Sequence, residues 1–97
     1  MLFMGGNKSM YSKKQYDLVI ALGQELKCMY DHAPESEQVT MIHVFAIKNG
    51  AKILSNSLKP SDIVHVAGIH DSYKTEVSKG IKLSKYVAVK ADVVLPV

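Results

Sequence analysis

The chain has 97 residues, a formal net charge of +3 and a hydrophobic fraction of 47%, so it supports one modest core and is not wholly disordered. Its longest apolar stretch is interrupted by His43 and Lys48 and is far shorter than the ~20 residues of a membrane-spanning helix. Its one cysteine, Cys28, cannot form an internal disulfide, and no signal-peptide pattern begins the chain. We therefore expect a cytoplasmic protein that does not enter a membrane.

The first two segments are predicted to be a tail and a long helix. Residues 1–12 contain two adjacent glycines, an asparagine and serines, which predicts a flexible N-terminal tail ahead of a single domain at 13–97. From Lys13 to His32 apolar residues recur at helical spacing. Gly23 costs this helix about 1 kcal/mol relative to alanine and favours a close helix crossing there. Pro34 ends the helix, since the residue before a proline is pushed out of the α region.

The stretch from Val39 to Leu54 fits two structures. Alternate residues from Val39 to Ile47 are apolar except for a histidine, as in a strand, and Asn49-Gly50 is a strong hairpin signal. Read as a helix, the same stretch has a wide apolar face. Periodicity does not separate a buried helix from a buried strand. We favour the helix, and a hairpin of 39–47 with 51–55 is the alternative.

The stretch from Pro60 to Tyr86 predicts two helices joined by a glycine turn. Pro60 suits the first turn of a helix, and Gly68 suits the left-handed residue that follows its last turn. Ser72 offers a hydroxyl to cap the next helix, which presents apolar residues on one side and most of its lysines on the other. A short helix, a glycine turn and a polar helix together are typical of a helix-turn-helix motif.

The second helix of this motif, at about 72–86, is the candidate recognition helix for duplex DNA. Residues 72–90 contain five lysines and one acidic residue, whereas 13–37 contain three lysines and five acidic residues. Residues at the start of a recognition helix lie nearest the base edges, and later lysines contact phosphates. The candidates are Ser72, Tyr73, Lys74, Thr75 and Ser78 for the bases, and Lys79, Lys82 and Lys85 for the phosphates. The chain has no arginine, the residue that most often reads guanine, and a lysine-rich helix face is also commonly only solvated.

Several stretches resemble a family of small bacterial proteins described only as having a helix-turn-helix-like domain. They are Ala33-Pro34-Glu35, Val39 to Lys48 and Ser72 to Val87. Ala67-Gly68-Ile69 is similar to the tight turn of the motif, and Thr75-Glu76-Val77-Ser78-Lys79 is similar to the opening of a recognition helix. The resemblance covers about 16–90, implies a helix-turn-helix fold and a DNA-binding name, and favours the helix at 39–54.

The end of the chain is predicted to be a β-strand. Apolar residues alternate with smaller or polar ones from Val87 to Leu95. A single strand on a helical domain leaves its backbone hydrogen bonds unmet. We therefore expect this strand to pair, for example with its equivalent in a second copy, and the protein to be a homodimer.

No sequence pattern points to catalysis or to a cofactor. The four histidines, His32, His43, His65 and His70, lack the spacing of a helical zinc site, and no nucleophile elbow or phosphate loop is present. We expect no enzyme activity, metal, cofactor or small-molecule substrate. The prediction is a mainly α domain of about four helices with a C-terminal strand, acting as a DNA-binding transcriptional regulator or accessory factor. The alternative is a protein-interaction module with the same fold and no DNA role.

Overall fold

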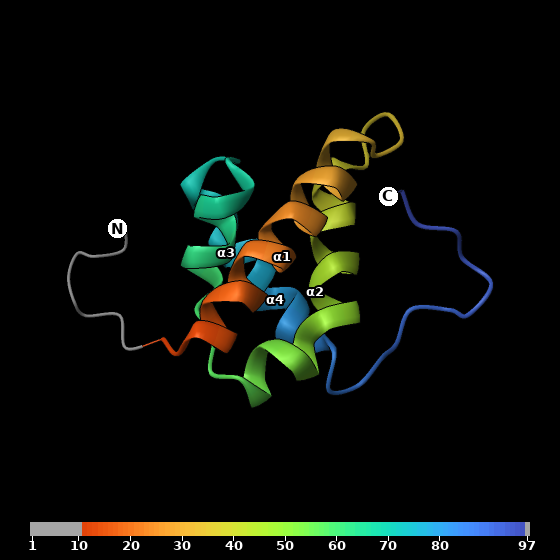
Figure 1. Cartoon of the computed structure of the whole chain (residues 1–97). Coiled ribbons are helices and arrows are strands. Elements are labelled where there is room, and N and C mark those ends of the chain that lie inside the picture. Colours follow the sequence, from red (N-terminus) through yellow and green to blue (C-terminus); the bar gives the residue numbers. More distant parts are fainter. Residues whose placement is uncertain (1–10, 97) are drawn as a thin grey trace.

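Four α-helices and one short 3-10 turn make up the regular structure of residues 11–96, the part of the chain that the computed structural model describes (Figure 1). In chain order they are α1 (Lys13–Asp31), α2 (Gln38–Ser55), α3 (Pro60–Ala67), the 3-10 turn η2 (Asp71–Tyr73) and α4 (Lys74–Leu83). The mainly helical prediction is confirmed. No helix among these residues is long and apolar enough to cross a membrane.

A capping box fixes the start of α1. The hydroxyl of Ser12 accepts a hydrogen bond from the Gln15 amide at 3.1 Å, and the Gln15 side chain accepts one from the Ser12 amide at 2.8 Å. These two bonds satisfy backbone donors that a helix start otherwise leaves unpaired. Residues 1–10 of the predicted tail lie outside the described residues.

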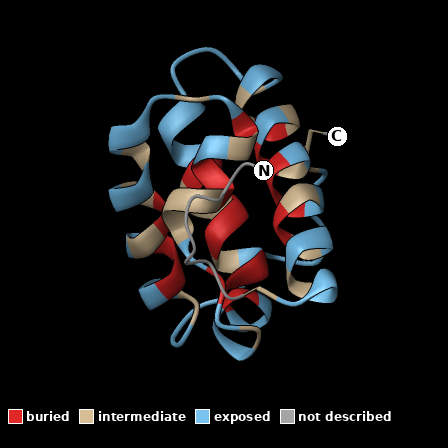
Figure 2. Ribbon diagram, turned by 60° about the vertical axis from the view of Figure 1, so that its left-hand side comes forward, coloured by how far each residue is buried: buried red, intermediate tan, exposed pale blue. Residues whose placement is uncertain are grey.

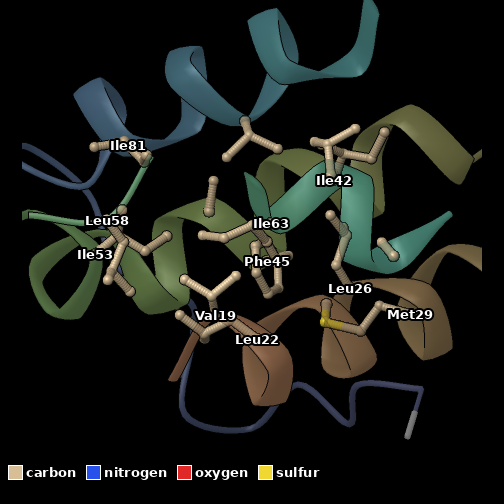
Figure 3. Close-up of a cluster of buried hydrophobic side chains, with 14 of the residues drawn as sticks. Val19, Leu22, Leu26, Met29, Ile42, Phe45, Ile53, Leu58, Ile63 and Ile81 are labelled. Carbon is tan, nitrogen blue, oxygen red and sulfur yellow. The ribbon is translucent and has the colours of Figure 1, made fainter. Parts of the chain in front are cut away.

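The core lies where all four α-helices meet. Buried residues line the inward sides of the helices, and exposed residues cover the outside (Figure 2). Phe45 of α2 is fully buried near the centre, with Val19, Leu22 and Leu26 of α1 on one side and Ile63 of α3 beside it (Figure 3). A contiguous cluster of this kind is what a chain of this length needs to fold.

The ambiguous stretch at 39–54 is a continuous helix, so the hairpin alternative is wrong. Asn49 is only 4% exposed, and its side-chain amide donates to the carbonyl of Phe45 at 3.0 Å and to the carboxylate of Glu25 at 3.1 Å. These bonds satisfy the amide inside the helix, where an Asn-Gly turn would have exposed it to solvent. Tertiary contacts therefore override the local turn signal.

Glycines set the spacing between packed helices. A Cβ at Gly80 of α4 would lie 2.5 Å from the Cβ of Ala46 and 2.9 Å from the carbonyl oxygen of His43 on α2. A Cβ at Gly50 would likewise collide with Ser84. The contact further along α2, at Gly50, is also further along the chain from α4, at Ser84. The helices α2 and α4 therefore run side by side in the same direction. The predicted close crossing at Gly23 is confirmed, because a Cβ there would collide with Val66 of α3.

The predicted C-terminal strand is wrong. None of residues 11–96 is in a β-strand, and the chain after Tyr86 is irregular. It turns where the Val93 amide donates to the carbonyl of Lys90 at 3.2 Å, and Leu95 packs against the core cluster. The physical reason is that a strand needs a neighbouring strand for its backbone hydrogen bonds, and the helical part of the chain offers none.

Candidate nucleic-acid interface

The sequence from α3 to α4 forms the two helices of the predicted motif. Gly68 follows α3 with φ 73° and ψ 18°, and its amide donates to the carbonyls of Val64 and His65 at 3.1 Å each. This left-handed conformation is cheap for glycine and costly for residues with a Cβ. The turn then leads into η2 and α4, whose residues Val77, Gly80 and Ile81 are buried against the rest of the domain.

The predicted cap at Ser72 is wrong. Ser72 lies within η2, and its hydroxyl lies 2.8 Å from His70 Nδ1, which also accepts a hydrogen bond from the Ser72 amide at 3.1 Å. The helix proper begins two residues later, at Lys74, after Tyr73, which makes no side-chain capping bond. The connection after Gly68 is long enough to form a turn of its own, and the His70 side chain caps that turn by accepting from the Ser72 amide.

Two adjoining hollows lie along one flank of α4. The first, which we call the α3–α4 hollow, is lined by Lys59, Pro60, Ser61, Lys74, Thr75 and Ser78. The second, the α2–α4 hollow, is lined by Ile53, Leu54, Leu58, Pro60, Ser78, Ile81, Lys82 and Lys85. Because Pro60 and Ser78 line both, the two hollows adjoin, and we call them together the groove. Within residues 11–96, no acidic residue lines either hollow.

The lysines of this groove differ in their partners. Among the described residues, Lys59, Lys82 and Lys85 have no acidic group within ion-pair distance of their ammonium groups. Lys74 forms a pair at 3.3 Å with Asp71, and both side chains are at least half exposed. A pair this exposed contributes little. The groove is therefore a locally uncompensated positive surface.

The opposite flank of α4 is neutralised by an ion-pair network. Glu76 accepts a hydrogen bond from His43 of α2 at 2.7 Å and pairs with Lys79 at 3.3 Å. The hydrogen bond from His43 holds the pKa of the Glu76 carboxyl below its usual range, and Lys79 lowers it further. The positive charge of Lys79 is thus partly balanced by the Glu76 carboxylate, unlike the charges of Lys82 and Lys85.

The predicted site residues therefore separate into three groups, namely those that line the groove, Lys79 on the other flank of α4, and Ser72 and Tyr73, whose side chains have other partners. Lys74, Thr75, Ser78, Lys82 and Lys85 line the groove, whereas Lys79 belongs to the other flank. Tyr73 turns toward the core. Its ring centroid is 5.7 Å from that of Tyr30, whose hydroxyl donates to the Tyr73 hydroxyl at 3.5 Å. The hydroxyl of Ser72 is engaged with His70.

Sequence reasoning missed Lys59 and Ser61. Both lie at the start of α3 and line the α3–α4 hollow together with Lys74. The signal available in the sequence was Lys59, directly before Pro60, the residue that begins the helix. Side chains at a helix start lie beside unpaired backbone amides, which attract anions such as phosphate. That Lys59 and Ser61 lie close to Lys74 could be seen only in the folded structure.

Comparison with known proteins gives one match. A family model described as an HTH-like domain matches residues 19–90, close to the range expected from the resemblance. The match runs from the first turns of α1 to beyond α4 and includes the whole groove. No curated protein matches the chain, and no solved structure does.

Proposed function

The chain belongs to the HTH-like domain family, and on that premise we propose that it binds duplex DNA through α4 and the start of α3. The observation that supports this proposal is the groove with three lysines, Lys59, Lys82 and Lys85, that have no ion-pair partner among the described residues. Neutralising phosphates with such lysines releases condensed counterions and supplies most of the affinity of non-specific DNA binding.

Within this proposal the groove residues have two roles. Lys74, Thr75 and Ser78 lie in the first turns of α4, the part of a recognition helix that reaches base edges. The three unpaired lysines contact phosphates on the same side of the helix. We leave Lys79 out of the phosphate set, because Glu76 already pairs with it. Ser72 and Tyr73 then position the start of α4 and do not read bases.

The absence of arginine shapes the expected specificity. Bidentate contacts from arginine to guanine are the commonest specific contacts in the major groove, and this chain has none to make. We therefore propose binding that is dominated by phosphates and only weakly selective, as in an accessory factor or a regulator that binds with a partner. Two copies bound together would double the phosphate contacts of this small module, and sedimentation of the protein with and without DNA tests that pairing.

Charge reversal tests the proposal. The Lys82→Glu/Lys85→Glu variant should weaken binding to labelled duplex DNA by at least roughly tenfold. Each lost phosphate contact lowers the slope of log affinity against log salt by about 0.9, so the slope should fall by about 2. The measurement is fluorescence anisotropy across a salt series, with circular dichroism to verify that the helices persist.

The matched control is the Lys27→Glu/Lys48→Glu variant. It changes the net charge equally, at two ion pairs away from the groove. It should keep most of the affinity. Equal losses in the two variants would mean that only net charge matters, and wild-type protein that does not bind DNA at low salt would reject the proposal altogether.

A further inference from the structure

The α2–α4 hollow has an apolar lining that DNA binding does not explain. It has a volume of about 310 Å³ and lies between the end of α2, the α2–α3 connection and the last turns of α4. Ile53, Leu58 and Ile81 contribute to it while remaining largely buried, and Leu54 is 54% exposed. The hollow therefore offers apolar side chains to solvent, and an apolar group bound there would be stabilised by its removal from water.

The charged residues that line this hollow are positive. Lys82 and Lys85 line it, and neither has an acidic partner among residues 11–96. No acidic side chain lines the hollow. A ligand that fits it best therefore combines two properties, namely an apolar group for the hollow and negative charge for the two lysines.

Duplex DNA supplies only the second property. Its phosphates would satisfy the lysines, but the sugar–phosphate backbone offers only the small C–H surfaces of deoxyribose and no large apolar group to fill the hollow. The apolar atoms of DNA in the major groove are thymine methyl groups at the base edges, which the first turns of a recognition helix reach. The α2–α4 hollow lies at the other end of α4, beside Lys82 and Lys85.

We propose that the α2–α4 hollow is a docking site for a short acidic peptide segment of a partner protein, with one large aliphatic or aromatic side chain as its anchor. The anchor enters the hollow against Leu54 and Ile81, and flanking aspartate or glutamate residues pair with Lys82 and Lys85. Recognition of a short segment by an apolar anchor with complementary flanking charges is a common mode of peptide binding. The site goes beyond the proposed function, because a docked peptide and DNA phosphates would compete for the two lysines.

Defined peptides and amide NMR test the proposal. The probe is a synthetic peptide with one leucine between aspartates and glutamates, and its matched controls have serine in place of the leucine or glutamine in place of the acids. The leucine-containing acidic peptide should shift the amide signals of Leu54, Leu58 and Ile81 most, and each control peptide should bind at least tenfold more weakly. Equal binding of the serine peptide, or shifts centred elsewhere, would overturn the proposal.

Two exposed leucines provide matched protein variants. Leu54 lines the hollow, whereas Leu83 is 44% exposed on α4 and does not line it. Leu54→Ser should weaken the peptide at least fivefold and leave the affinity for duplex DNA unchanged, and Leu83→Ser should change neither. Loss of DNA affinity in Leu54→Ser would make the hollow part of the DNA interface instead. Concentration-dependent shifts of the Leu54 amide without peptide would assign the hollow to a second copy of the chain.

Discussion

The two flanks of α4 carry the same type of residue in different electrostatic settings. On the flank toward α3, Lys82 and Lys85 line a groove to which the described part of the chain contributes no acidic residue. On the flank toward the first half of α2, Lys79 pairs with Glu76, which is itself held by His43. A lysine available to a phosphate is thus separated from a lysine with its own counter-charge by less than one turn of helix.

This contrast shows that lysine count is a poor guide to a binding face. All the lysines of α4 are solvent-exposed, so exposure alone does not rank them either. What ranks them is whether a carboxylate that is itself held in place lies within ion-pair distance. Glu76 beside Lys79 is held by His43, whereas Asp71 beside Lys74 is largely exposed and that pair contributes little. The close approach at Gly80 contributes to this asymmetry, because it lets α4 lie directly on α2 with Glu76 beside His43.

The largest predicted effect comes from removing that close approach. Gly80→Val would push a side chain into Ala46 and the carbonyl of His43, and overpacking of this kind costs about 2–3 kcal/mol. The substitution would displace the residues on both flanks of α4, so the free energy of unfolding and the affinity for DNA should both fall. Thermal unfolding should show a decrease in Tm of roughly 10 °C or more. Thr75→Val, on the exposed side of the same helix, is the control and should stay within about 0.5 kcal/mol; equal stability of the two variants would contradict the packing described here.

A smaller effect is expected from making the two flanks alike. Glu76→Gln removes the carboxylate that pairs with Lys79, so Lys79 should become available to phosphates. The affinity for duplex DNA and its salt slope should therefore rise slightly, and anisotropy across a salt series measures both. An unchanged or lower slope would mean that Glu76 does not restrain Lys79.

The same variant should change how stability depends on pH. The folded state lowers the pKa of Glu76 below its ordinary value of 4.5, first through the hydrogen bond from His43. A lowered folded-state pKa means that the ionised carboxylate stabilises the fold above pH 4.5, and that this contribution is lost as the pH falls through the folded-state pKa. Wild type should therefore be more stable than Glu76→Gln at pH 7, and the difference between their urea midpoints should shrink as the pH falls below 4.5. A difference that is constant over this range would show that the carboxylate charge contributes nothing.

Local sequence signals predicted much of the fold. Helical periodicity placed α1, Pro60 and Gly68 delimited α3, and Gly23 marked a close crossing that the structure confirms. The favoured helix at 39–54 is confirmed, and the competing hairpin signal at Asn49-Gly50 fails because its outcome depends on distant residues. Glu25 accepts a bond from Asn49, and Ser84 occupies the space beside Gly50. The alternation of apolar residues after Tyr86 misled for a related reason, since a strand is defined by a partner that the pattern itself does not supply.

The candidate site was predictable in part. The i, i+3 spacing of Glu76 and Lys79 is a signal of pairing that the sequence contains, although the sequence prediction assigned Lys79 to the phosphates. The additional bond from His43, and the proximity of Lys59 to Lys74, depend on how α2 and α3 pack against α4. The sequence therefore indicated which helix carries the candidate site, and the folded structure was needed to show which side of that helix carries the unpaired lysines.

The most direct test of the central claim compares two single substitutions on the same helix. Lys82→Ala and Lys79→Ala change the net charge equally, and wild type, both variants and one labelled duplex are measured across one salt series. If the groove flank contacts DNA, Lys82→Ala lowers the salt slope by about 0.9 and Lys79→Ala leaves it nearly unchanged. Equal decreases in both variants, or a larger decrease for Lys79→Ala, would contradict the assignment of the DNA face to the flank of α4 that adjoins α3.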